Sequence, residues 1–183
     1  KALKRERREA LGNGITIGRM RWQLQAPLES VYAEYPDTIN LGLIADGQST
    51  FCLAGEQETQ CDPGCIFLRN GLPGVFRNRA PSGMLMTGVS LDLPHELVRA
   101  MRDDGSDISW LGHRNSYAIL KPSPSTGAML RSMAQAMLAI RTDACVLARL
   151  ELESLSLGLL LQLMAAGPGV RPPKLRQIPQ RWR

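Results

Sequence analysis

The chain has 183 residues, of which 44% are hydrophobic and 21% are charged, a composition that suits a globular protein with a sizeable core. No run of about 18 uninterrupted apolar residues occurs, so the sequence predicts no membrane-spanning helix. The charged start, residues 1–11, has no apolar run behind it and does not resemble a secretion signal. Four cysteines are too few for a disulfide scaffold, so we expect reduced, mostly packed thiols and a cytoplasmic location.

The net charge of +5 is unevenly distributed along the chain. The residues before Gly12 carry +3 and those after Ala166 carry +5, whereas the body between them has 12 basic and 15 acidic side chains, a net −3. A folded body with this balance is not expected to bind a polyanion. We therefore assign residues 1–13 to a basic N-terminal segment and residues 167–183 to a basic, proline-rich linker.

Short alternating segments occupy the chain from residue 14 to residue 91. Apolar residues alternate with polar or small ones around residues 15–17, 31–35 and 39–43, the pattern of half-buried strands. Asp46-Gly47 predicts a hairpin, and Asp62-Pro63-Gly64 predicts a turn before a buried strand. Seven or eight such strands predict a sandwich or barrel, and we assign residues 14–91 to a β-barrel that binds an effector.

From residue 92 the apolar period changes from that of strands to that of helices, so we assign residues 92–166 to a helical dimerisation region. Asp92 is the expected cap of a first helix that ends at residues 103–105. A second helix is expected to begin near Ser123 or Ser125, and a third after Thr142 or Asp143. The third should end at Gly167, and the last two should form an antiparallel pair.

The third predicted helix has apolar residues on more than one face. One face can pack on the rest of the chain. A second apolar face must then be buried against a partner, most simply a second copy of the chain. The alternative is burial of every face within one chain. We expect a homodimer through this last helix, and the residues that we assign to its interface are Leu147, Leu150, Ser154, Leu157 and Leu161.

Residues that catalyse reactions or hold metals are sparse. The two histidines, His95 and His113, follow the predicted strands, so the barrel offers no set of metal ligands. Cys61 and Cys65 flank a turn and could form part of a zinc site, but two packed strand cysteines are the favoured interpretation. No phosphate-binding loop, nucleophile elbow or dinucleotide motif occurs, so we predict neither an enzyme nor a cofactor.

The predicted strands carry side chains that suit a ligand pocket. Aromatic and methionine residues would supply apolar walls and arginines would supply fixed charges, although ordinary core packing or solvent exposure is the alternative for each. Arg69 follows a buried strand and is the first candidate for holding an anionic effector. The full set that we assign to effector binding is Arg69, Arg19, Trp22, Tyr32, Phe51, Phe76, Met84 and Met86.

The order of these parts resembles a known family. The strand, turn and strand of residues 59–68, the helix that follows, the helical pair and the basic linker resemble the N-terminal regulatory half of AraC-type bacterial transcription regulators. Residues 41–47, 64–71 and 149–155 are most similar to regulators that sense ferric siderophores of the pyochelin type. The resemblance implies an α+β fold, a cupin-like double-stranded β-barrel followed by a helical hairpin, which binds a small-molecule effector and dimerises.

In that family promoter DNA is bound by a C-terminal domain with two helix-turn-helix units. The residues after Arg171 are too few for one such unit, so we expect DNA binding to belong to an absent domain. Two other hypotheses remain open. One is a metal-free cupin-like enzyme that acts on a small polar metabolite, and the other is a structural pairing module whose barrel is filled by Phe51, Phe67 and Phe76.

Overall fold

The computed structural model describes residues 3–23, 28–32, 38–53, 59–70, 74–79, 85–111, 116–141 and 145–166. Its strands are β1 (Leu3–Ala10), β2 (Thr16–Gln23), β3 (Leu28–Tyr32), β4 (Thr38–Asp46), β5 (Ser49–Leu53), β6 (Thr59–Cys61), β7 (Ile66–Asn70), β8 (Gly74–Arg79), β9 (Leu85–Pro94) and β10 (Ser116–Leu120). Its helices are α1 (His95–Asp103), α2 (Pro124–Ala139) and α3 (Val146–Ala166), with a short 3-10 turn at Ser109–Leu111.

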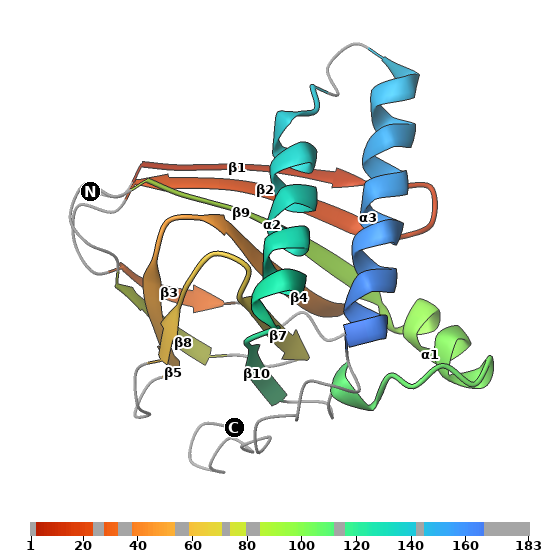
Figure 1. The fold of residues 1–183 in the computed structure, drawn as a ribbon, viewed down its shortest axis with the longest axis horizontal. Helices are drawn as coiled ribbons and strands as arrows, with labels where there is room; N and C mark the ends of the chain where they lie inside the picture. Colours follow the sequence, from red (N-terminus) through yellow and green to blue (C-terminus); the bar gives the residue numbers. More distant parts are fainter. Residues whose placement is uncertain are drawn as a thin grey trace.

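The strands form two antiparallel sheets (Figure 1). The larger sheet has six strands in the order β1-β2-β9-β4-β7-β10, and the smaller sheet has four in the order β3-β8-β5-β6. Helices α2 and α3 stand beside each other on one face of the larger sheet (Figure 1). The predicted α+β class, with a cupin-like barrel followed by a helical hairpin, is confirmed. None of the helices described is long and apolar enough to cross a membrane.

Two strands lie outside the barrel range expected from the sequence. β1 pairs with β2 along its whole length, from Leu3 opposite Gln23 to Ala10 opposite Thr16, so most of the basic N-terminal segment is an edge strand. β10 pairs with β7 inside the range assigned to helices. The apolar alternation that reveals a half-buried strand is weak in both, because β1 is dense in charge and β10 is short.

The starts of two helices can be compared with the caps expected from the sequence. The Ser123 hydroxyl accepts a hydrogen bond from the Thr126 N–H at 3.2 Å, so the predicted cap of α2 is confirmed. The prediction of Asp92 as the cap of α1 is wrong, because β9 continues through Pro94, which takes the cap position. The caps expected at Thr142 or Asp143 and the stop at Gly167 lie outside the described residues.

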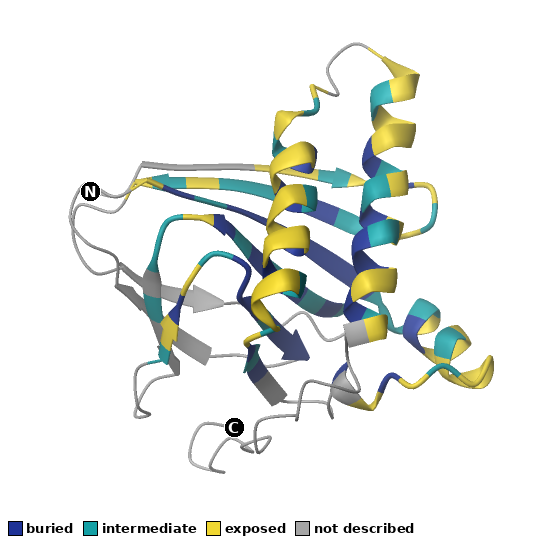
Figure 2. Cartoon of the chain, in the orientation of Figure 1, coloured by how far each residue is buried: buried dark blue, intermediate teal, exposed yellow. Residues whose placement is uncertain are grey.

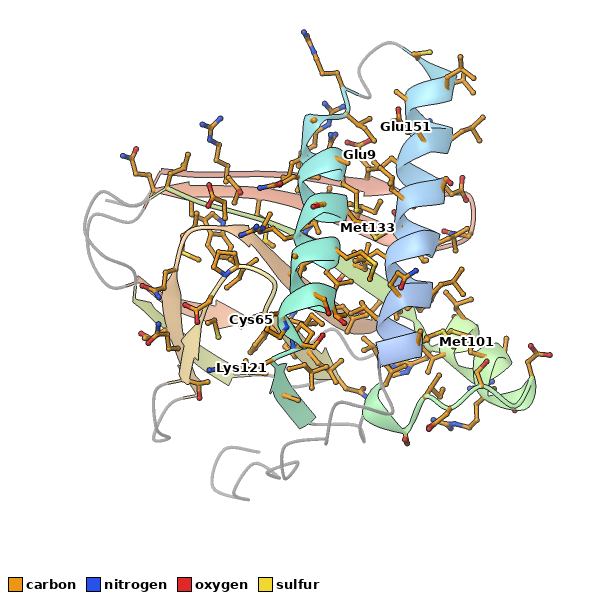
Figure 3. The ribbon with its side chains drawn as sticks, in the orientation of Figure 1. Glu9, Cys65, Met101, Lys121, Met133 and Glu151 are labelled. Atoms are coloured by element: carbon orange, nitrogen blue, oxygen red, sulfur yellow. The ribbon has the colours of Figure 1, made fainter. Side chains whose placement is uncertain are left out.

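The core lies between the larger sheet and the two long helices. Leu41 of β4 lies opposite Leu68 of β7 and Leu91 of β9, and all three side chains are buried. Met133 of α2 packs over Gly158 of α3, and Figure 3 shows Met133 between the two helices. Each large aliphatic side chain buried here stabilises the fold by about 1.5–3 kcal/mol. This core fixes the helical pair on one face of the sheet and leaves the other face to the second sheet and a cavity.

Candidate functional site

A cavity lies on the face of the larger sheet that the helices do not cover. Its volume is about 90 Å³, below the roughly 300–1,000 Å³ of sites that enclose a drug-sized ligand, so the described walls would enclose only part of such a ligand. One row of residues runs across five strands beneath it: Phe67, Gly42, Ser90, Gly18 and Arg8 are successive register partners, and all but Gly18 line the cavity. A Cβ atom on Gly42 would make only ordinary contacts with Phe67, at 3.7 and 3.8 Å, so this glycine leaves space for a ligand.

One end of the cavity is polar and charged. Asn40 of β4 lies opposite both Arg69 of β7 and Asp92 of β9. The Asn40 Nδ2 group donates to Asp92 Oδ1 at 2.6 Å, and Arg8 Nη1 donates to Asp92 Oδ2 at 3.3 Å. Arg69 is only 4% exposed. Arg8 and Arg69 are the ionisable side chains among the described residues that line the cavity. Their guanidinium groups suit carboxylates and similar anions, which they bind through paired hydrogen bonds.

The other end of the cavity is apolar. Trp22 of β2 lies opposite Met86 of β9, and Met20 and Ile44 extend the same wall. The indole Nε1–H of Trp22 is buried and has no acceptor among the described residues. A buried donor without an acceptor costs about 1–3 kcal/mol, so an acceptor atom on a ligand would recover stability there. The cavity thus combines an apolar, aromatic end with a cationic end.

The structure separates the residues that the sequence assigned to effector binding. Arg69, Trp22 and Met86 line the cavity, whereas the side chains of Tyr32, Phe51, Phe76 and Met84 lie outside the described residues. Phe67 lines the cavity wall, and the described interior is therefore not completely filled. Whether these residues bind an effector stays a prediction.

Arg19 lies outside this cavity, on the opposite face of the sheet, so the structure does not bring it together with the other residues assigned to effector binding. Its guanidinium is paired with the Glu9 carboxylate and donates to the Ile140 carbonyl, and to the Met137 carbonyl at 3.5 Å. Arg19 and Trp22 are three positions apart on β2, and successive strand residues point to opposite faces, so both could not line one site. Arg19 instead satisfies carbonyl groups at the C-terminal end of α2.

Four further residues line the cavity and were not predicted from the sequence: Arg8, Asn40, Gly42 and Ser90. Arg8 was assigned to a basic tail, and its ion pair with Asp92 spans 84 positions of the sequence. Asn40 could have been found, because in β4 the buried positions alternate with less buried ones and Asn40 belongs to the second set.

A second candidate surface runs along α3. Four apolar side chains assigned to the dimer interface remain exposed in the single chain: Leu147 at 72%, Leu150 at 55%, Leu157 at 41% and Leu161 at 63%. Ser154 lies exposed among them, whereas Leu152, Leu159 and Leu163 on the other side are buried (Figure 2). The exposed positions recur at intervals of three and four residues, the spacing of a coiled-coil seam. The placement suits an interface, and dimerisation itself stays a prediction.

Comparisons with known proteins agree with this architecture. Two solved structures share the fold: the AraC-like transcriptional activator CuxR, with 20% identity and a TM-score of 0.57, and ToxT from Vibrio cholerae O395, with 9% identity and a TM-score of 0.53. The likeness covers 94% and 84% of this chain but only 59% and 52% of those chains, so the chain spans little more than half of their length. At these identities the likeness shows the fold alone. No curated protein sequence matches the chain.

The family comparison covers nearly the whole chain. Residues 4–177 match the family model described as the regulatory protein PchR N-terminal domain. This match begins within β1 and includes both sheets, α2 and α3, so it spans the cavity as well as the exposed face of the last helix. It confirms the predicted resemblance and indicates a regulatory domain rather than an enzyme. The chain belongs to the family of PchR N-terminal regulatory domains.

Proposed function

We propose that this chain is the effector-binding and dimerisation part of a cytoplasmic bacterial transcription regulator of the AraC type. It senses a small molecule and thereby controls DNA binding by a C-terminal helix-turn-helix domain. The observation that carries the proposal is that one sheet has a cavity on one face and, on its other face, a helical pair with an exposed apolar seam.

The strands of the sheet link the two faces. Asn40 lines the cavity, whereas its neighbour Leu41 packs in the core under the helices. A packed core does not deform continuously. A ligand that shifts β4 or β9 therefore also shifts the core side chains on which α2 and α3 pack. Effector binding in this way changes the position of α3 and its exposed surface, without direct contact between the ligand and that helix.

The cavity favours an effector with an aromatic or apolar body and an anionic group. Trp22 and Met86 would pack against the body, and Arg8 and Arg69 would bind the anion. A ferric siderophore of the pyochelin type, the effector expected from the family resemblance, is the first compound to test.

The seam of α3 supports a homodimer. A second copy of α3 would cover Leu147, Leu150, Leu157 and Leu161, which are otherwise exposed to water in one chain. The spacing of three and four residues lets two such helices interlock along their length. Promoter DNA is bound only by the further domain, two copies of which the dimer would hold together.

The test is calorimetric titration of the purified chain with the siderophore, iron-loaded and iron-free, with the oligomeric state measured on the same sample. We expect saturable binding that prefers the ferric form, and at least tenfold weaker binding by Arg69→Met. The matched control is Arg131→Met, which changes an exposed arginine of α2. A folded dimer that gives no heat with either form would reject the siderophore, and an effector-independent monomer would reject the proposal as a whole.

A further inference from the structure

A tight turn between β6 and β7 brings two buried cysteines together. The Cys65 N–H donates to the Asp62 carbonyl at 3.0 Å, and Gly64 has a positive φ of 93°. The turn is held against β4, because Gly64 N–H donates to the Ile44 carbonyl at 2.8 Å and Ile44 N–H donates to the Cys65 carbonyl at 3.2 Å. The side chains of Cys61 and Cys65 therefore lie against each other in one buried cluster.

The two thiols are chemically unequal. The hydrogen bond from Cys61 lowers the pKa of Cys65 to about 7, and the positive charge of Lys121 acts in the same direction. The same hydrogen bond and burial raise the pKa of Cys61 above its usual range. Cys65 is also the more exposed, at 7% against 2%. Figure 3 shows Cys65 near Lys121 at the lower end of α2.

We propose that Cys61 and Cys65 are an oxidisable dithiol that a peroxide converts into a disulfide. The Cys65 thiolate attacks one oxygen of hydrogen peroxide, the O–O bond breaks, and the departing hydroxide takes up a proton to become water. Cys65 is then a sulfenic acid. The Cys61 sulfur attacks the Cys65 sulfur, the S–O bond breaks, and the oxygen leaves with the Cys61 proton as a second water. Two electrons pass from the thiols to the peroxide.

The position of this pair gives its oxidation a consequence for the rest of the domain. Cys61 and Cys65 pack against Trp22 and Ile44, both of which line the cavity. On its other side the turn contacts α2, since Gly64 lies against Gly127. A disulfide holds its two Cβ atoms about 3.5–4.5 Å apart, so it would tie the two ends of the turn together between these contacts. The dithiol thus lies at the junction of the cavity wall and the helical pair.

The first test isolates the pair chemically. The chain has no lysine or arginine between Arg21 and Arg69, so one tryptic peptide contains Cys52, Cys61 and Cys65. We would therefore use the Cys52→Ser/Cys145→Ser protein, in which only the pair remains. Hydrogen peroxide should lower the mass of the folded protein by about 2 Da, abolish labelling of both thiols by maleimide, and be reversed by a dithiol reductant. A gain of about 16 or 32 Da without that loss, or two thiols that stay free, would overturn the proposal.

A second test separates the roles of the two sulfurs. With Cys61→Ser added, Cys65 should be trapped as a sulfenic acid by dimedone, whereas with Cys65→Ser added, Cys61 should react on the order of tenfold more slowly. In urea the two variants should react alike, because the difference comes from the fold. Equal rates in the folded proteins would overturn the assignment. If either variant fails to fold, brief alkylation of the folded Cys52→Ser/Cys145→Ser protein decides the order, since Cys65 must be labelled before Cys61.

Discussion

Gly64 of the β6–β7 turn and Gly127 of α2 lie so close that a Cβ atom on Gly64 would come within 2.8 Å of the Gly127 carbonyl oxygen. Backbone meets backbone at this contact, with no side chain between the turn and the first part of the helix. The turn also borders the cavity through the cysteine pair, so the contact is a direct structural link from the cavity side of the sheet to the helices.

Gly64→Ala should therefore destabilise the domain. The alanine would be strained at a positive φ and its Cβ would collide with α2, a combined cost of about 2–4 kcal/mol in urea unfolding. The control is Gly105→Ala, which has a similar φ of 82° but no atom within 4 Å of the added Cβ, and should cost only about 1–2 kcal/mol. Equal losses in the two variants would show that the contact with Gly127 is unimportant.

Arg19→Gln should lower stability by about 2–3 kcal/mol, because the carbonyl groups at the end of α2 lose their donor and Glu9 keeps only its ion pair with Arg7. Arg21→Gln, two positions along the same strand and exposed, should change the free energy of unfolding by less than about 0.5 kcal/mol. Thermal unfolding of the two variants side by side measures the difference. A neutral Arg19→Gln would show that the arginine does not cap α2.

Leu150→Glu and Leu157→Glu should each weaken the dimer on the order of a hundredfold, because a carboxylate would have to be buried in the seam of α3. Both side chains are exposed in the single chain, so the fold should be retained. Sedimentation equilibrium measures the association. Met129→Glu, an exposed apolar residue of α2 away from the seam, is the control and should leave the dimer unchanged.

Gly42→Val should block effector binding without unfolding the protein. The new side chain would extend from a position where a Cβ makes only ordinary contacts, and valine suits a strand. Gly88→Ala is the comparison variant and should destabilise the sheet. A Cβ at this position would lie 2.7 Å from the Leu43 carbonyl oxygen and must displace the backbone. Calorimetric titration combined with melting distinguishes a filled cavity from a damaged sheet.

The alkylation rate of Cys65 in the Cys52→Ser/Cys145→Ser protein should depend on pH with a midpoint near 7. The thiolate is the reactive form, so a lowered pKa keeps the thiol reactive at a pH where an ordinary cysteine, with a pKa of about 8.5, is mostly protonated. Replacing the donor by Cys61→Ala should move the midpoint to higher pH, whereas Cys61→Ser retains a donor. A midpoint that is the same in all three proteins would show that Cys61 does not act on Cys65.

Local patterns predicted those parts of the fold that depend on local periodicity. The alternation in β4 and the cap at Ser123 required only neighbouring residues, and the excess of leucine on α3 predicted an uncovered face. The contacts of Arg19 could not be predicted, because nothing in the composition of β2 distinguishes a pocket arginine from one that caps a helix. The ion pair between Arg8 and Asp92 depends on the pairing of β1, β2 and β9, which only the assembled sheet defines.

The edge position of β1 has a practical consequence. Its charged sequence makes it a poor template for strand addition, and it occupies the backbone hydrogen-bonding groups along the outer side of β2. A protein trimmed to begin at Gly14 would leave that side of β2 open, with Met20 and Trp22 beside a free row of N–H and C=O groups. Such a protein would be prone to pair sheet edge to sheet edge. This self-association would not involve α3, yet in a measurement of mass it would look like dimerisation through that helix.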